Sequence, residues 1–300
     1  MNDPLLTALV DARNPDGGWP TVKPGPSTTE VTALAVLALA AASDPTLGSE
    51  IAGGRRWLLS QQQSDGGWPS ARPVTESSWM TAPAVLALST DASSRSAAIQ
   101  GGRWLLEREG RGLPWYARVW FWMYPQSRTS NLDTELKGWP WSAGTFSWVE
   151  PTAYSLLALK KVRTALPASR IQARIEQGER LIYDRVCPGG GWNYGNTRVL
   201  GESLAPYADT TAVALLAVHD REPREEARRG LRVLEELMRD VRSGLALGWA
   251  SLCFDLYGLS SAPWRTRLRE QYGQTRFLGK VKPLALAVLA LHDGARMVRG

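Results

Sequence analysis

The stretch from Glu30 to Leu39, EVTALAVLAL, decides the fold because it recurs along the chain without gaps. Each copy spans about three helical turns, or ~15 Å, and is apolar nearly all round. A helix without a polar face must be buried on every side, and its alanines let neighbouring helices approach closely. The copies therefore predict inner helices. They occupy residues 30–39, 79–88, 150–159, 209–218 and 282–291, with a weaker sixth copy at 250–259.

Two other segments alternate with these copies. Glycine- and tryptophan-rich loops precede four of them, and amphipathic segments with a charged face predict outer helices. The alternation predicts an all-α fold, a single (α/α)6 toroid (a double-walled helical barrel) that takes residues 1–300 as one domain; an open α-solenoid is the alternative. The loops lie at 16–20, 65–69, 137–140 and 189–193, and the outer segments at 4–12, 49–63, 96–109, 171–185, 223–242 and 263–272.

Composition narrows the class of protein. The chain is 44% hydrophobic and 21% charged over 300 residues, which suits a large core and excludes a disordered protein. No apolar run reaches the roughly 18 residues of a membrane span. The start, Met1 to Pro4, lacks a secretory signal, and two cysteines make no disulfide framework, so we expect a cytoplasmic protein. The net charge of +6 comes without a nucleic-acid module, so no nucleic-acid partner is expected.

The aligned copies begin with Glu30, Trp79, Glu150, Asp209 and Lys282. In a closed barrel these first positions ring one mouth. An acid at a helix start is favoured as the anion by ~0.3–1 kcal/mol, whereas burial and nearby like charge raise a carboxyl pKa. For Asp209 both a capping role and a catalytic-acid role stay open. Glu30 and Glu150 are expected to act as caps or hydrogen-bond partners, and Lys282 is the base best placed to meet a diphosphate.

One aromatic stretch interrupts the repeat. It runs from Trp115 to Tyr124, carries no Ala/Leu pattern and is accompanied by Arg111 and Arg118. One interpretation is a lid or a membrane-touching entrance for an apolar substrate, which would place the protein peripherally on a membrane. The other is an irregular helix and loop that plugs the core.

The stretch from Gly54 to Trp68, GRRWLLSQQQSDGGW, resembles the QW motif of the terpenoid cyclase and prenyltransferase repeat superfamily. That superfamily includes squalene-hopene cyclases and the β-domain of class II terpene cyclases. Weaker copies lie at 102–106 and 180–192, so the resemblance covers most of the chain. It implies an (α/α)6 toroid in which Gln and Trp tie an outer helix to the next loop.

A second motif bears on chemistry. Residues 207–212, YADTTA, resemble the D-x-D-T-T variant of the D-x-D-D acid motif, found in single-domain cyclases that make drimane-type sesquiterpenes from farnesyl diphosphate. The resemblance implies that Asp209 is the proton donor and that Thr210 and Thr211 match the variant and lie at the substrate. Tyr207 stands where the motif has its first Asp.

Protonating an alkene makes a carbocation, which aromatic faces stabilise by ~0.5–2 kcal/mol each when water is excluded. Tryptophans are unusually frequent, 14 against 4 Phe and 8 Tyr. Those in the repeat loops and on outer helices are expected to pack, namely Trp19, Trp57, Trp68, Trp104 and Trp192. The expected wall of a substrate cavity is Trp79, Trp148, Tyr154, Trp249, Phe254 and Tyr257.

No metal-binding set emerges from the sequence. Prenyltransferase β subunits belong to the same superfamily, and this resemblance would imply zinc held by an Asp-x-Cys pair and a distant His. Here Asp184 and Cys187 have the wrong spacing for such a pair, and Cys253 and Asp255 occur in the wrong order. Magnesium-binding motifs of ionising terpene synthases are also absent. We therefore expect no cofactor, with Mg²⁺ only as a counter-ion of a diphosphate.

The sequence thus predicts a class II-type terpene cyclase. It would cyclise an isoprenoid, such as farnesyl or geranylgeranyl diphosphate, after protonation by Asp209, with Glu30, Glu150 and Tyr207 tuning that acid. The alternative is a non-catalytic toroid that binds an isoprenoid or a protein partner, since Tyr207 replaces an acid of the motif. A partner domain or a homodimer remains compatible with either hypothesis.

Overall fold

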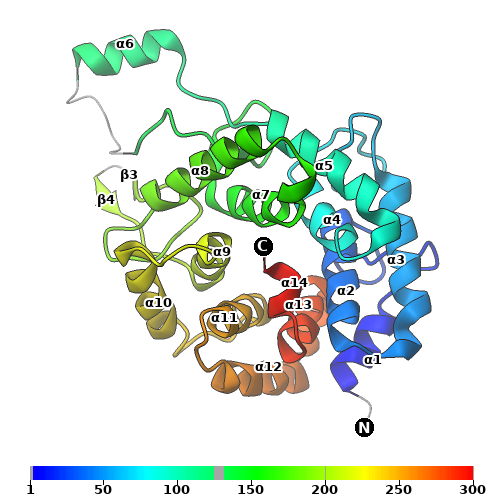
Figure 1. The fold of residues 1–300 in the computed structure, drawn as a ribbon. Helices are drawn as coiled ribbons and strands as arrows, with labels where there is room; N and C mark the ends of the chain where they lie inside the picture. Colours follow the sequence, from blue (N-terminus) through cyan, green and yellow to red (C-terminus); the bar gives the residue numbers. More distant parts are fainter. Residues whose placement is uncertain (1–2, 125–131, 200, 300) are drawn as a thin grey trace.

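Six inner helices form a closed ring in the computed structural model, which describes residues 3–124, 132–199 and 201–299. Each inner helix packs against the next, and the last packs against the first (Figure 1). Their alanines and leucines are almost all buried, as an apolar helix requires. The inner helices are α2 (Thr29–Ala42), α4 (Thr81–Leu88), α7 (Val149–Val162), α9 (Ala208–Val218), α11 (Gly244–Leu256) and α13 (Val281–Leu291).

The outer helices surround this ring and confirm the all-α toroid. Most pack chiefly on the inner helix that precedes them in the chain. The first outer helix has no predecessor, and it packs on α13 instead. The N-terminal helix therefore closes the outer wall over the last inner helix. The outer helices are α1 (Pro4–Asp11), α3 (Gly48–Gln61), α5 (Arg95–Glu107), α8 (Ala168–Asp184), α10 (Glu225–Leu237) and α12 (Ala262–Thr275).

Two expected helix starts need correction. The inner helix expected at 250–259 is α11, which begins at Gly244 because Ser243 caps it and accepts a hydrogen bond from the Ala246 amide. Alignment on the Ala/Leu pattern missed this start because Trp249 interrupts the pattern. Trp79 lies in the turn before α4, which begins at Thr81.

The Gly-Trp loops are tied to both walls by the same two hydrogen bonds in four repeats. The indole Nε1 donates to a carbonyl near the end of the preceding outer helix, and the tryptophan amide donates to a threonine hydroxyl of the next inner helix. Each loop thereby fixes an outer helix against an inner one. The sets are Trp19 with Leu9 and Thr32, Trp68 with Leu58 and Thr81, Trp139 with Leu105 and Thr152, and Trp192 with Ile182 and Thr211.

A glycine on the following outer helix makes room for each indole. At Gly101 of α5, a Cβ atom would lie 2.7 Å from Cζ3 of Trp68 and 2.5 Å from Cγ2 of Val85. The spacing is too close for any side chain, so glycine is required by packing rather than by backbone conformation. Gly54, Gly178 and Gly230 occupy the same place against Trp19, Trp139 and Trp192.

Short elements connect the walls. Strand β1 (Trp139–Pro140) pairs antiparallel with β2 (Ser147–Trp148), and β3 (Arg198–Val199) pairs with β4 (Glu202–Ser203). Helix α6 (Trp115–Met123) projects away from the ring (Figure 1), so the segment does not plug the core. The remaining elements of the described residues are the 3-10 helices η1 (Pro45–Leu47), η2 (Ala92–Ser94), η4 (Arg163–Ala165) and η5 (Arg276–Gly279), and the helix α14 (Ala295–Val298).

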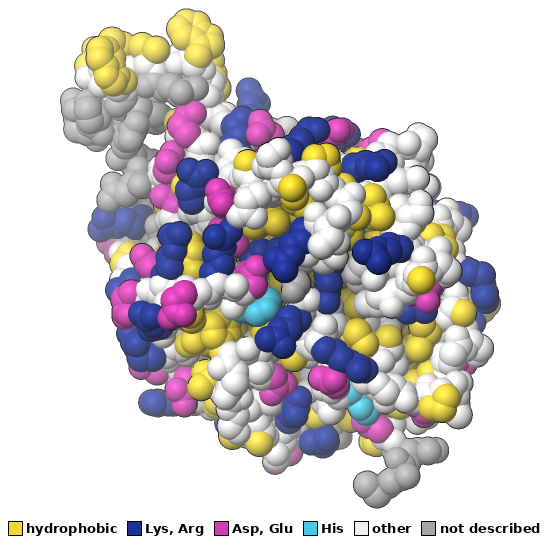
Figure 2. Space-filling model, viewed as in Figure 1, with side chains coloured by type: hydrophobic (Ala, Val, Ile, Leu, Met, Phe, Trp, Pro, Cys, Tyr) yellow, Lys and Arg dark blue, Asp and Glu magenta, His cyan; other side chains and the backbone are white. Residues whose placement is uncertain are grey.

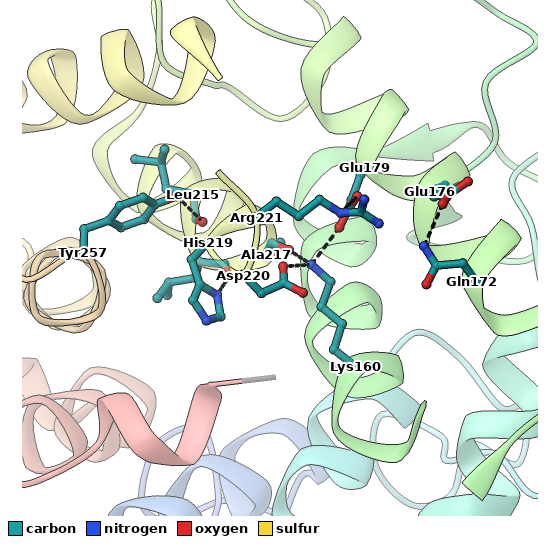
Figure 3. A network of polar contacts seen from close by, with 11 residues as sticks. Lys160, Gln172, Glu176, Glu179, Leu215, Ala217, His219, Asp220, Arg221 and Tyr257 are labelled. Atoms are coloured by element: carbon teal, nitrogen blue, oxygen red, sulfur yellow. Dashed lines mark hydrogen bonds and ion pairs between the residues drawn. The ribbon is translucent and has the colours of Figure 1, made fainter. Parts of the chain in front are cut away.

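The end of the ring where inner helices finish is held by a buried ion cluster (Figure 3). Nζ of Lys160 in α7 donates to the Ala217 carbonyl of α9 at 2.7 Å and pairs with Asp220 and with Glu179 of α8. Arg221 pairs with the other oxygen of Glu179 at 2.8 Å. The cluster joins three helices across two repeats.

Helix α14 bridges the same end. Its Arg296 donates to Ser43, just after α2, and the Arg296 carbonyl accepts from Lys161 of α7. The buried side chain of Val298 packs in the core. The C-terminal helix therefore spans this end, and the ring's other end, where inner helices begin, carries the site described next.

Candidate functional site

Four charged side chains meet at the end where the inner helices begin. Glu30, Glu150, Asp209 and Lys282 are each the second residue of their helix, in α2, α7, α9 and α13. Equivalent helix starts converge in a closed ring, which brings together residues up to 252 positions apart. Three carboxyl groups thus share one ammonium group.

Lys282 is the centre of this cluster. Its Nζ lies 2.7 Å from Oε1 of Glu30 and 3.7 Å from Oε1 of Glu150. Burial disfavours the ammonium charge, but the two carboxylates outweigh it and raise the pKa of Lys282. The amine expected to meet a diphosphate is therefore already paired with protein carboxylates.

The carboxyl of Glu150 has a raised pKa. Burial is the main cause and raises the pKa of Glu150 to about 7, with further upward contributions from the charges of Glu30 and Asp209 and a downward one from Lys282. Near neutral pH its carboxyl is therefore available both as an acid and as a base.

Aromatic rings stand directly behind the charged cluster. Tyr154 lies one turn after Glu150 on α7, is fully buried and donates from its hydroxyl to Oε1 of Glu30 at 3.4 Å. Its ring meets Trp79 at 5.4 Å and Trp249 at 5.5 Å, both edge-on. Burial, with the charge of Glu30, raises the pKa of Tyr154 well above its usual value, so the phenol stays neutral.

Asp209 lies at the rim beside two tyrosines. Its Oδ1 accepts from the Thr210 amide at 2.9 Å, and its charge acts on Glu150, Lys282 and Tyr194. Tyr207 precedes α9, is 48% exposed and contacts the Tyr194 ring at 5.3 Å. The position where the acid motif has its first Asp therefore holds an exposed phenol at the mouth.

The two threonines of this motif differ in surroundings. Thr211 accepts from the Trp192 amide at 2.9 Å and donates to the Trp192 carbonyl at 3.1 Å, as part of the repeated loop contact. The Thr211 hydroxyl is therefore engaged in a structural contact with the loop. Thr210 is buried beside Asp209.

Three of the expected wall residues lie away from the charged cluster. Phe254 stacks on Trp264 of outer helix α12 at 6.0 Å, so it lies between the two walls. Tyr257 donates to the Leu215 carbonyl at the end of the ring that carries Lys160 (Figure 3). Trp148 precedes α7 in strand β2 and lines a separate pocket of about 230 Å³.

A cleft opens beside the aromatic wall. Its volume is about 380 Å³, the size of a small-molecule site. Trp79 lines this cleft and also contacts Tyr154, so its indole separates the cleft from the buried phenol. Trp104, Trp139 and Trp141 line the same cleft, together with Asp65.

Sequence reasoning missed two of these aromatic residues. Trp141 meets Trp79 edge-on at 5.0 Å, and Tyr194 contacts Tyr207 at the rim. A signal existed, because both follow a loop tryptophan by two residues, as Trp141 after Trp139 and Tyr194 after Trp192.

In the part of the chain that the structure describes, no group of three His, Cys, Asp or Glu side chains could hold a metal ion. Among the same residues, every helix is too short or too polar to cross a membrane. The thiols of Cys187 and Cys253 are free and buried.

Comparison with solved structures finds toroids of different chemistry. The terpene cyclase MstE from Scytonema, a type II enzyme solved with geranylgeranyl dihydroxybenzoate, has 13% identity and a TM-score of 0.58 over 98% of this chain and 96% of that one. The α-1,6-mannanase GH76A of Salegentibacter sp. HEL1_6 has 10% identity and a TM-score of 0.62 over 98% and 97%. An α-amylase from Clostridium perfringens has 10% identity and a TM-score of 0.61 over 96% of each chain.

At such identities the likeness shows the (α/α)6 toroid fold alone. No protein-family model matches the sequence, and no curated protein does. Function must be argued from the site.

Proposed function

We propose that this chain is an isoprenoid cyclase that begins its reaction by protonating a carbon–carbon double bond. The observation that carries the proposal is the place of the Glu150 carboxyl at the mouth, one turn before Tyr154 on α7 and 3.7 Å from Nζ of Lys282, where burial raises its pKa to about 7. A general acid works best when its pKa lies near the working pH. In this proposal the Glu150 carboxyl donates the proton, and the aromatic side chains stabilise the cation that results.

The first step needs only the groups at the mouth. The O–H bond of protonated Glu150 breaks, its proton bonds to one alkene carbon through the π electron pair, and the other carbon becomes a cation. A neighbouring double bond attacks this cation and closes a ring, and loss of a proton to a base ends the sequence. The new Glu150 carboxylate lies beside the ammonium of Lys282, which stabilises it.

The aromatic rings stabilise the cation. Trp79 lines the cleft, and its indole face contributes ~0.5–2 kcal/mol to a desolvated cation there. Tyr154 packs edge-on behind Trp79, and Trp249 packs edge-on against Tyr154, so both hold the indole in place. Glu30 holds the Tyr154 hydroxyl and the Lys282 ammonium together. These contacts orient the ring and keep the ammonium close to Glu150.

Asp209 is the rival acid within the same proposal. The resemblance to the D-x-D-T-T motif assigns the proton to Asp209, whereas burial and electrostatics favour Glu150. The proposal takes Glu150 as donor and Asp209 as the carboxylate that raises its pKa.

The test is product analysis with purified protein. Farnesyl diphosphate, geranylgeranyl diphosphate and geranylgeranyl dihydroxybenzoate are the substrates, the last because the MstE neighbour binds it. We expect cyclised product from the wild type and a loss of about 10²–10⁴-fold in Glu150→Gln. Glu235→Gln, on the exposed face of α10, is the matched control.

Two outcomes would count against the assignment. Full activity in Glu150→Gln with loss only in Asp209→Asn would move the acid to Asp209. No product from any substrate would exclude the cyclase and leave the non-catalytic isoprenoid-binding toroid.

A second candidate activity is glycoside cleavage. The Lys282 ammonium lies 2.7 Å from Glu30 and 3.7 Å from Glu150, so two carboxyl groups lie near each other. Glycoside cleavage uses such a pair, in which one carboxyl acts as the acid with a raised pKa, as burial gives Glu150. The mannanase neighbour makes α-1,6-mannan the substrate to test. Release of reducing sugar that Glu150→Gln abolishes would favour this activity.

A further inference from the structure

Helix α6 is the most exposed apolar element of the described chain. Trp115 and Trp122 are 75% and 77% exposed, and four further large apolar side chains of the helix are open to solvent. Figure 2 shows hydrophobic side chains gathered on the projecting arm at the upper left. Among the described elements, none packs extensively on α6. Soluble surfaces seldom expose so many large apolar groups together, so the helix is expected to have a partner.

The exposed side chains share one side of the helix. At 100° per residue they fall within an arc of about 160°, while Ala117, more buried, lies opposite. The helix is about 13 Å long, so it can lie flat on a surface. We call this side the aromatic face; it consists of Trp115, Tyr116, Val119, Trp120, Trp122 and Met123.

Residue type and charge identify the partner. Tryptophan and tyrosine have an apolar ring with a polar tip and concentrate where lipid headgroups meet hydrocarbon. Residues 110–124 contain Arg111 and Arg118 and no acidic residue, which complements an anionic lipid surface. A symmetric contact between two copies of this segment would bring like charges together.

We infer that α6 docks the protein on an anionic phospholipid bilayer by burying its aromatic face at the headgroup level. The helix lies in the plane of the interface and does not cross the bilayer. Leu113, just before α6 in the chain, lines the pocket of about 230 Å³ together with Phe146 and Trp148. Trp148 directly precedes α7, which carries Glu150. The docking itself does not rest on the proposed function.

The experiment is vesicle co-sedimentation with the full chain. Vesicles of phosphatidylcholine and phosphatidylglycerol at about three to one are compared with phosphatidylcholine alone. We expect the anionic vesicles to bind the protein and added salt to weaken the binding. The variant Trp115→Ser/Trp120→Ser/Trp122→Ser should lower the partition coefficient by about tenfold or more.

The control is Leu278→Ser, which removes an equally exposed apolar side chain, 78% exposed, outside α6. It should bind like the wild type. Because α6 packs so little on the ring, the triple variant should keep its thermal melting temperature, which is measured in parallel.

Equal binding by the triple variant and the wild type would overturn the inference, as would absence of binding to anionic vesicles. Sedimentation velocity tests the other partner: a dimer that the triple variant loses, without vesicle binding, would assign the aromatic face to a second copy. None of these measurements needs catalytic turnover, so a failed cyclase assay leaves the docking result independent.

Discussion

At the scale of the residue, one ammonium group organises the mouth. Nζ of Lys282 lies 2.7 Å from the Glu30 carboxyl and 3.7 Å from the Glu150 carboxyl, so the ammonium is closer to one of them than to the other. This asymmetry explains why two glutamates at equivalent helix positions serve different purposes. Glu30 holds Tyr154, while Glu150 keeps a proton near neutral pH.

The raised pKa of Glu150 predicts a dependence of stability on pH. The folded state binds a proton at Glu150 that the unfolded chain has released, so the unfolding free energy falls as pH rises from the usual glutamate pKa through about 7. The Glu150→Gln variant lacks this contribution. The difference between wild type and variant should change by about 3 kcal/mol across that window, with the variant gaining at high pH.

Chemical denaturation of both proteins at a series of pH values measures this difference. Groups outside the mouth titrate equally in both proteins and cancel. A difference that stays constant from acid to neutral pH would show that Glu150 titrates normally.

At the scale of the element, the outer helices are shaped by the loops they cover. Glycine in a helix interior ordinarily costs ~1 kcal/mol relative to alanine. The chain accepts that cost at Gly101 and its three counterparts because an indole occupies the space of a side chain. The repeat also indicates a structural role for Thr211. Its hydroxyl accepts a hydrogen bond from a loop tryptophan amide, as the hydroxyls of Thr32, Thr81 and Thr152 do in the other repeats.

Gly101→Ala should therefore destabilise the protein by ~1–3 kcal/mol, through overpacking against Val85 and Trp68. Gly273→Ala in α12 is the matched control, because nothing lies within 4 Å of its Cβ position. There the substitution should stabilise by ~0.5–1 kcal/mol. Thermal melting of the two variants checks the opposite signs, and a loss of similar size at both sites would refute the packing argument.

At the scale of the whole molecule, the two ends of the ring differ. One end is joined by the cluster around Lys160 and bridged by α14, and the other carries the charged mouth. A ring built from repeats has two chain ends to join, and α1 joins them by covering α13. Because both walls are closed, the charged side chains that could react with a ligand lie at the mouth.

Lys160→Met should cost up to ~3–5 kcal/mol, because Asp220 and Glu179 both lose the buried ammonium and Glu179 is left with the half-exposed Arg221. The loss is expected in the unfolding free energy, measured by urea denaturation. Arg163→Met, exposed at the end of the same helix, should change it by less than ~0.5 kcal/mol. Equal stability of the two variants would mean that the cluster does not hold the repeats together.

The sequence alone predicted the all-α toroid and most helix bounds. Apolar decamers and amphipathic segments are local patterns, and repetition of a local pattern specifies the same unit each time. The convergence of first positions was also foreseeable, since equivalent helix starts meet in a closed ring. The start of α11 was misplaced because its pattern was weakest where Trp249 enters the core.

Only the tertiary structure decided which of these residues interact. The pairing of Lys282 with Glu30, the contact of Tyr154 with Trp249 and the approach of Trp141 to Trp79 join side chains from different helices and loops. The raised pKa of Glu150 depends on burial and on charges contributed by three other helices. Helical period fixes where a side chain points on its own helix, but distances between helices are set by packing of the closed ring, and electrostatics follows distance.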